Sequence, residues 1–332
     1  MSAKTRPAVK RSNIPTTMHA MAIDRYGGPE VLSMHTLPVP APTANEVLIA
    51  VHTAEVGGWD AQIRDGWSAD GKKPRFPLVL GGGCSGTVAA VGSRVRRFKE
   101  GEPVYAYAWD YPRAGFYAEY VVVPGTSAAP VPSPLDLKHA GAVPIAGITA
   151  LQGIDDALHV KKDERVIIYG GSGGLGVFAI QFAKLRGARV LATASGPAGI
   201  ALVRKLGADA AVDGRDGDIA RAAQEFAPDG VDAILALAGG GTLERCIEAL
   251  RKGGRLAYPN GIEPEPKRRR GIKTKPYDGV PGRKEFERLS RAIEAARLQV
   301  PIAAEFALAD AVRAHERLAQ GHILGKIVLR VR

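Results

Sequence analysis

Three glycines, Gly171, Gly173 and Gly176, stand in the spacing GxGxxG between an apolar run of strand length and a helical apolar pattern. In that context the first glycine permits a tight turn, the second lets the backbone approach a pyrophosphate, and the third allows the helix to pack on the strand. The helix N-terminus adds free N–H groups and a partial positive charge. We therefore expect a dinucleotide site rather than a plain turn, with contacts from Gly171, Ser172, Gly173, Gly174, Leu175 and Gly176.

The strand expected at 188–193 is followed by Ala194 and Ser195, without the acidic residue that binds the adenosine ribose hydroxyl of NAD. Ser195 can donate a hydrogen bond to a phosphate oxygen, and Arg204 or Arg215 could add a cation. In the alternative interpretation, Ser195 only caps the next helix. This end of the site predicts NADPH rather than NADH.

Two regions of the chain differ in their patterns. Between 18 and 140, short β-branched runs are broken by glycine and proline, which is typical of a compact antiparallel barrel or sandwich. From 141, strands and helices alternate, which predicts right-handed βαβ crossovers around a buried parallel sheet. The later elements that we expect are a helix at 241–253, a strand at 254–259, a loop at 260–283, a helix at 284–298, a strand-like run at 302–308, a helix at 310–320 and a strand at 325–332.

The composition is that of a soluble globular protein. The 332 residues are enough for two domains, and 45% of them are apolar and 24% charged. No run of 18 apolar residues occurs, so we expect no membrane partner. The N-terminus lacks the apolar core of a secretory signal, and we interpret 1–17 as a disordered basic tail rather than a targeting signal. Two distant cysteines, Cys84 and Cys246, indicate a reducing compartment, and we expect a cytoplasmic location.

The net charge of +11 is concentrated in two short segments. Residues 1–17 carry four basic side chains and 267–275 carry six, with no acidic residue in either segment. The rest of the chain is therefore nearly neutral, whereas a nucleic-acid-binding domain would spread positive charge along a face or groove. We interpret both segments as solvated surface and expect no nucleic-acid partner.

Several longer motifs make the chain resemble the medium-chain dehydrogenase/reductase superfamily, in particular its zinc-independent quinone oxidoreductase (zeta-crystallin-like) branch. Beside the glycine turn, they are AIDRYGGPEVL (22–32), FPLVLGGGCSGTVAAVGSRVRRFKEGEPVYA (76–106), GFYAEYVVVP (115–124), AGAVPIAGITALQGI (140–154) and GHILGKIVLRV (321–331). The resemblance implies an α/β protein with a discontinuous GroES-like β-barrel catalytic domain, 18–140 and 300–332. It also implies a Rossmann domain at 141–299, with a doubly wound parallel sheet that binds NADP, and a homodimer.

In zinc-dependent members of this superfamily, metal ligands stand at positions that correspond here to Gly57, to Gly82 and Gly83, and to Ile145. None of these residues offers a thiolate, imidazole or carboxylate. Cys84 follows one of the positions, but a lone thiol is more often a small buried residue. We expect no metal.

The resemblance also assigns residues around the reacting centre. Many relatives have Asn where Gly57 stands, with its side chain near the nicotinamide. In this chain the contact to the nicotinamide must therefore come from another residue. The residues implied near the cofactor are Gly57, Thr149, Ala238, Gly239, Asn260 and Lys326. The residues implied at the substrate are Trp59, Arg64, Trp109 and Tyr111, and the candidate catalytic residues are Trp59, Asp60 and Tyr111. The aromatic residues could instead be packed core, and His322 is expected at the surface.

Without a metal, no Lewis acid would polarise an alcohol or carbonyl oxygen. The remaining chemistry is hydride transfer to an electron-poor acceptor, with the protein positioning the reactants and excluding water. The resemblance implies the same outcome, NADPH-dependent reduction of a quinone or an α,β-unsaturated carbonyl (an enone or enal). Two alternatives stay open: an enoyl-thioester reductase whose basic segment 267–275 binds a carrier phosphate, and an RNA-binding or scaffold protein that holds NADPH.

Overall fold

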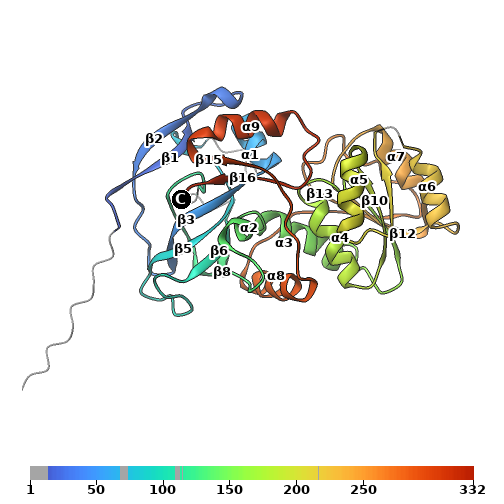
Figure 1. The fold of residues 1–332 in the computed structure, drawn as a ribbon, viewed down its shortest axis with the longest axis horizontal. Helices are drawn as coiled ribbons and strands as arrows, with labels where there is room; N and C mark the ends of the chain where they lie inside the picture. Colours follow the sequence, from blue (N-terminus) through green and yellow to red (C-terminus); the bar gives the residue numbers. More distant parts are fainter. Residues whose placement is uncertain (1–13, 68–73, 109–112, 114, 216) are drawn as a thin grey trace, which may run out of the picture.

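The computed structural model describes residues 14–67, 74–108, 113, 115–215 and 217–332. Figure 1 shows a β-rich part, built from both ends of the chain, beside an α/β part built from its middle. The last strand therefore lies among strands from the first third of the sequence. This arrangement places the C-terminal motif GKIVL next to the middle of the molecule.

The α/β part contains one six-stranded sheet in the order β11-β10-β9-β12-β13-β14, and every neighbouring pair is parallel. The chain runs outward from β9 in one direction and then returns to continue from β12 in the other. The carboxyl ends of β9 and β12 therefore form the switch point at which such sheets bind ligands. The strands are β9 (Arg165–Tyr169), β10 (Arg189–Ala194), β11 (Ala210–Asp213), β12 (Val231–Ala236), β13 (Leu250–Pro259) and β14 (Lys273–Tyr277).

Helices cover both faces of this sheet because alternate residues of each strand point to opposite faces. Val166 and Ile168 of β9 belong to the core beneath α3, α4, α5 and α8, whereas Ile167 and Tyr169 belong to the core beneath α6 and α7. The helices are α3 (Pro144–Gln152), the π-helix η3 (Gly153–Ala157), α4 (Gly176–Leu185), α5 (Gly196–Lys205), α6 (Ile219–Phe226), α7 (Gly241–Glu248) and α8 (Arg283–Ala296).

The β-rich part is a barrel-like pair of sheets. Strand β16 closes it by pairing antiparallel with β3, and β15 extends the edge in parallel with β16. Its strands are β1 (Thr17–Ile23), β2 (Leu32–Pro38), β3 (Glu46–Val56), β4 (Leu78–Val79), β5 (Gly83–Val91), β6 (Pro103–Tyr107), β7 (Tyr120–Pro124), β8 (Ala128–Pro130), β15 (Ile302–Ala307) and β16 (Lys326–Arg330). Its helices are α1 (Gly58–Arg64), α2 (Leu137–Gly141), α9 (Ala311–Ala319) and the short 3-10 turns η1 (Pro29–Val31), η2 (Gly125–Ser127) and η4 (Leu308–Asp310).

Three sequence expectations differ from the structure. The helix expected at 241–253 ends at Glu248, and β13 begins at Leu250 with a register irregularity opposite β12. The segment 260–283 contains β14, an edge strand whose mostly exposed, proline-containing sequence hides the alternation that identifies inner strands. Strand β1 begins at Thr17, inside the expected tail, whose residues 1–13 lie outside the described residues. Among the described residues, no helix is long and apolar enough to cross a membrane.

Candidate cofactor and acceptor site

The turn after β9 has the close packing that its glycines predict. A Cβ on Gly176 would clash with the carbonyl oxygen of Gly170, and one on Gly171 would lie 2.9 Å from Ala192 Cβ. Gly173 differs, because the nearest atom to a Cβ there is 3.4 Å away. The backbone at Gly173 is therefore open, and α4 begins directly behind it. This arrangement fits the pyrophosphate of a dinucleotide.

Lys326 brings the last strand of the barrel to this turn. A Cβ on Gly174 would lie 3.2 Å from Lys326 Cδ, and Lys326 Nζ is 2.8 Å from Glu55 Oε2. Both side chains of the pair are almost fully buried, and Glu55 Oε1 also accepts a hydrogen bond of 2.8 Å from Ile145 N. A buried cation is thus held between the glycine turn and the barrel.

The carboxyl end of β10 lies at the other end of the candidate cofactor site. Ser195 N donates to Ser172 Oγ at 3.1 Å, and Ser195 Oγ is 3.4 Å from Nδ1 of the exposed His322. Ser195 occupies the N-cap position of α5, but its side chain makes no capping hydrogen bond to the described residues of that helix. Gly196 has a φ of +67°, and a Cβ there would lie 2.6 Å from Arg215 Nη2.

Of the two arginines considered for this end, Arg215 is the one beside Ser195. Its Nη2 donates to Asp213 Oδ2 at 3.2 Å, and its side chain is 45% exposed. The hydrogen bond from Arg215 is the main reason why the pKa of Asp213 falls from 3.8 to about 2. Arg204 lies in the last turn of α5, roughly 12 Å along the helix from Gly196.

A pocket opens between the barrel and the parallel sheet. The barrel contributes α1 and the ends of β4 and β6, and the other side contributes α3, the end of β13 and the segment before α8. The pocket is lined by Trp59, Asp60, Ile63, Gly81, Gly82, Tyr107, Ile145, Thr149, Pro259, Asp278 and Gly279. Its lining includes Gly82 and Ile145, which are two of the positions where zinc-dependent relatives have ligands. In the described part of the chain, no three His, Cys, Asp or Glu side chains gather as a metal site would require.

Three of the expected site residues, Trp59, Asp60 and Thr149, lie in this lining. Others lie beside it or at the switch point. Gly57 N donates to Asp60 Oδ2 at 2.8 Å, and Asn260 Nδ2 donates to Asp278 Oδ2 at 2.9 Å.

Ala238 and Gly239 follow β12 at the switch point. A Cβ on Gly170 would lie 3.5 Å from Ala238 Cβ, so Ala238 is next to the start of the glycine turn. A side chain on Gly239 would clash with the Glu263 carbonyl, so the backbone after β13 passes directly over it. The structure therefore brings both residues to the carboxyl edge of the sheet, where the resemblance implies them.

Arg64 corrects one expectation, because it is not part of the described pocket lining. It is 6% exposed, and its guanidinium donates to Gly27 O, to Asp65 Oδ1 and to His315 Nδ1. This nearly buried guanidinium is therefore paired within the protein rather than offered to a substrate. The expectations for Trp109 and Tyr111 lie outside the described residues.

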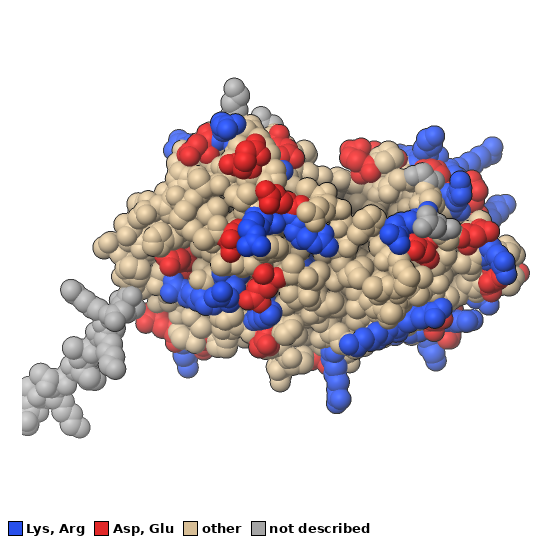
Figure 2. Space-filling view, turned by 45° about the horizontal axis from the view of Figure 1, so that its top comes forward, with Lys and Arg blue, Asp and Glu red and all other residues tan. Residues whose placement is uncertain are grey.

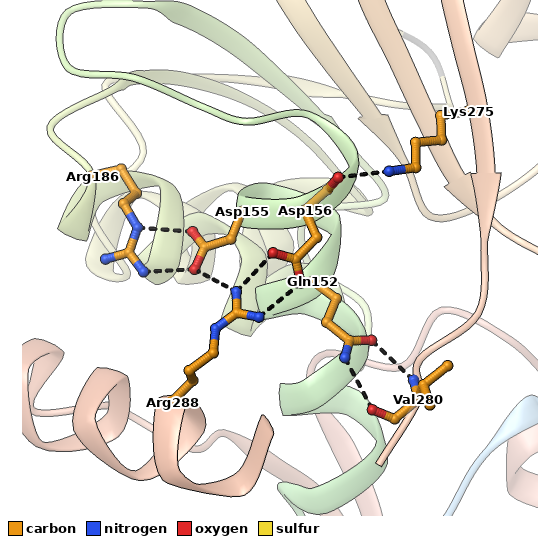
Figure 3. A network of polar contacts seen from close by, with 7 residues as sticks. All are labelled: Gln152, Asp155, Asp156, Arg186, Lys275, Val280 and Arg288. Atoms are coloured by element: carbon orange, nitrogen blue, oxygen red, sulfur yellow. Dashed lines mark hydrogen bonds and ion pairs between the residues drawn. The ribbon is translucent and has the colours of Figure 1, made fainter. Parts of the chain in front are cut away.

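A network of polar contacts anchors the segment that carries Asp278 and Gly279 (Figure 3). Gln152, at the end of α3, donates to Val280 O at 3.0 Å and accepts from Val280 N at 2.9 Å. Next to it, the π-helix is fixed by Arg288 of α8, which pairs with Asp155 and Asp156. The pocket wall is therefore held by contacts outside the pocket.

The main group that the sequence did not point to lies behind Asp60. Tyr117 Oη donates to Asp60 Oδ2 at 3.1 Å and is 3.2 Å from His315 Nε2. Burial raises the pKa of Asp60 to about 6 and is also the main cause that lowers the pKa of His315 to about 4. The helical spacing of the sequence could have indicated that His315 is buried, because it shares a helix face with Ala311 and Ala314, which are fully buried.

The fold and the site together define a two-domain dehydrogenase in which a GroES-like barrel faces a nucleotide-binding sheet. Two family profiles match the chain: "Alcohol dehydrogenase GroES-like domain" at residues 43–133 and "Zinc-binding dehydrogenase" at residues 206–329. A pig (Sus scrofa) quinone oxidoreductase is 31% identical, over 94% of this chain and 97% of that protein. The chain therefore belongs to the quinone oxidoreductase branch of the medium-chain dehydrogenase/reductase superfamily, as the sequence resemblance indicated.

Two solved structures illustrate the fold. One, described as an NAD-dependent alcohol dehydrogenase, is 30% identical with a TM-score of 0.88, over 95% of this chain and all of that one. The other is a mycobacterial protein in complex with NADPH, 27% identical with a TM-score of 0.84, over 95% of this chain and all of that one. A pyridine nucleotide is therefore common to both neighbours, but one is described as NAD-dependent and the other was solved with NADPH.

Proposed function

We propose that this protein reduces quinones or α,β-unsaturated carbonyls with hydride from NADPH. The observation that carries the proposal is the continuity of the site from the glycine turn to the pocket. Lys326 contacts the turn at Gly174 and pairs with Glu55, which in turn binds the backbone of Ile145 in the pocket lining. A dinucleotide lying along the turn would therefore present its reactive end to the pocket. When bound, NADPH supplies the hydride.

The preference for NADPH over NADH rests on the end of β10. Ser195 offers a hydroxyl where an acidic side chain would repel a 2′-phosphate, and the Arg215 guanidinium lies over Gly196. Asp213 holds that guanidinium in place through its hydrogen bonds. These contacts favour the phosphorylated cofactor because a guanidinium binds phosphate oxygens strongly.

We propose that the reaction needs no zinc. Gly82 and Ile145 bring no donor atom to the pocket, and a Cβ on Gly83 would press against the Glu55 carboxylate. An acceptor that is already electron-poor does not require a Lewis acid, so its flat ring or enone could lie beside Trp59 and Thr149. We further propose that 18–140 and 300–332 form the catalytic domain and 141–299 the cofactor domain. We also propose that the protein is a cytoplasmic homodimer, and that Trp109 and Tyr111 contribute to the substrate site.

The decisive experiment is a set of initial rates in the presence of EDTA. NADPH and NADH are each offered with 1,4-benzoquinone, an aliphatic enal and an enoyl-CoA. Oxidation of NADPH by the quinone or the enal, undiminished by EDTA, supports the proposal. NADPH binding without turnover on any acceptor contradicts it.

The alternatives that use the basic segment receive less support. Arg269 Nη2 donates to Glu244 Oε2, and Lys275 Nζ donates to Asp156 O, so part of this charge is engaged within the protein. On the face shown in Figure 2, basic side chains form separate groups with acidic ones among them. A nucleic-acid partner would give binding that weakens steeply with salt and disappears when 267–275 is neutralised.

A further inference from the structure

A chain of buried hydrogen bonds leads from Arg64 to the pocket, and its direction can be deduced. Arg64 Nη1 is 2.8 Å from His315 Nδ1, and a guanidinium can only donate. Nδ1 therefore accepts, so the single proton of the neutral imidazole is on Nε2. That nitrogen, 3.2 Å away, donates to the oxygen of Tyr117. Tyr117 then has one proton to give, and it goes to Asp60 Oδ2.

The chain ends on one oxygen of the Asp60 carboxyl. Both hydrogen bonds that described residues donate to this carboxyl, from Tyr117 Oη and Gly57 N, end on Oδ2. When Asp60 is neutral, its proton therefore lies on Oδ1. Asp60 lines the pocket together with two other ionisable residues, Tyr107 and Asp278, so this proton lies at the wall of the candidate substrate site.

We propose that Asp60 is the general acid of the reductase reaction, and that the chain from Arg64 through His315 and Tyr117 positions it by keeping the proton on Oδ1. This inference rests on the function proposed above. Hydride addition to the β-carbon of an enone leaves an enolate that has gained two electrons and needs one proton. The O–H bond of Asp60 breaks, the proton bonds to the enolate, and the electron pair remains on the carboxylate. Water regenerates the acid after the product leaves.

His315 cannot relay further protons in this arrangement. If Nε2 gave its proton to Tyr117, Nδ1 would have to take one from the guanidinium of Arg64, and a guanidinium does not give up a proton in proteins. The three residues are therefore positioning residues, and Asp60 delivers one proton in each turnover.

The charges around Asp60 are compatible with an acid that is protonated up to about pH 6. Burial is the largest cause of its raised pKa of about 6, and Glu55 on β3 raises it further. Lys326 on β16 and the Tyr117 hydroxyl act in the opposite direction, and Asp278 faces the pocket from the segment before α8. Behind Tyr117, burial and then the charge of Arg64 lower the pKa of His315 to about 4, which keeps it neutral.

The test combines rates with a titration that needs no cofactor. For the wild type, kcat/KM with an enone should be constant at low pH and fall tenfold per pH unit above about 6. Asp60→Asn should lose roughly 100-fold in rate and the pH break, with NADPH affinity retained and a Tm no lower than that of the wild type. Tyr117→Phe should move the break to higher pH, because its hydroxyl stabilises the carboxylate. Asp24→Asn, an exposed carboxylate change, is the matched control.

Carbon-13 NMR of labelled aspartate in the apoprotein should show a carboxyl that titrates near pH 6 and is missing in Asp60→Asn. A titration near pH 4 would overturn the proposal. If the wild type is active and Asp60→Asn keeps both the rate and the pH break, the role of Asp60 is overturned but the proposed function is not. A wild type that reduces no acceptor would overturn the proposed function and this role with it.

Discussion

The ammonium of Lys326 lies 2.8 Å from the carboxylate of Glu55, and both side chains are almost fully buried. The pair joins β16 to β3 and lies between the glycine turn and the pocket. A Cβ on Gly83 would press against Glu55, so the glycine at that former ligand position makes room for the carboxylate.

Removing one partner of the Lys326–Glu55 pair should destabilise the folded protein. We expect Glu55→Gln to lower the free energy of unfolding by roughly 3–5 kcal/mol, because an unpaired ammonium would remain buried. Urea unfolding of the apoprotein measures the change, and adding Lys326→Met should recover part of the loss. Arg221→Ala, which breaks an exposed pair with Glu225, should leave the free energy of unfolding nearly unchanged. A loss below about 1 kcal/mol for Glu55→Gln would contradict the pairing.

Arg215 should discriminate between the two nicotinamide cofactors. Arg215→Ala should weaken NADPH binding roughly 10- to 100-fold, the usual value of a charged hydrogen bond, and leave NADH binding unchanged. Fluorescence titration with each cofactor gives both Kd values. Arg204→Ala serves as the control, since Arg204 lies at the far end of α5. Equal losses for both cofactors would show that Arg215 has another role.

Alanine substitutions at two glycines of the turn should have different effects, one on stability and the other on cofactor affinity. At Gly176 a methyl group would clash with the Gly170 carbonyl, so Gly176→Ala should cost roughly 1–3 kcal/mol of stability. At Gly173 there is space, so Gly173→Ala should leave Tm unchanged and lower cofactor affinity by obstructing the phosphate. Thermal melts and NADPH titrations of the two variants separate these effects. Similar losses of Tm would argue against an open face at Gly173.

The buried acid Asp60 should also affect stability. Because its folded pKa of about 6 lies above the ordinary 3.8, the folded chain binds the proton more tightly, and stability falls as pH rises through this interval. Asp60→Asn, which does not ionise, should therefore be more stable than the wild type at pH 7, by up to roughly 3 kcal/mol. The difference should vanish at pH 4 and below. The lowered pKa of His315 makes stability depend on pH in the opposite sense, but it does so in both proteins. Its contribution therefore cancels when their free energies of unfolding are compared.

The sequence by itself determined the classes of element and the position of the nucleotide turn. Glycine spacing, strand length and helical periodicity are local properties, so they predicted the βαβ order and the turn at the GxGxxG motif. The residues after β10, which include no acid, could be read directly from the sequence once that strand was placed. The same local reasoning failed at β14, because an exposed edge strand needs no alternating apolar face. It also extended the helix at 241–253 into the start of β13, since periodicity does not show where a strand begins to pair.

Only the tertiary structure decided which distant residues meet. Arg215 and Arg204 were equivalent in sequence, and the fold placed Arg215 beside Gly196 and Arg204 two turns away. Arg64, expected at the substrate, is turned inward to His315, 251 residues further along the chain. Burial and long-range partners set the protonation of Asp60 and the pairing of Lys326. These depend on the packing of α9 and β16 against the first third of the chain, which no local pattern records.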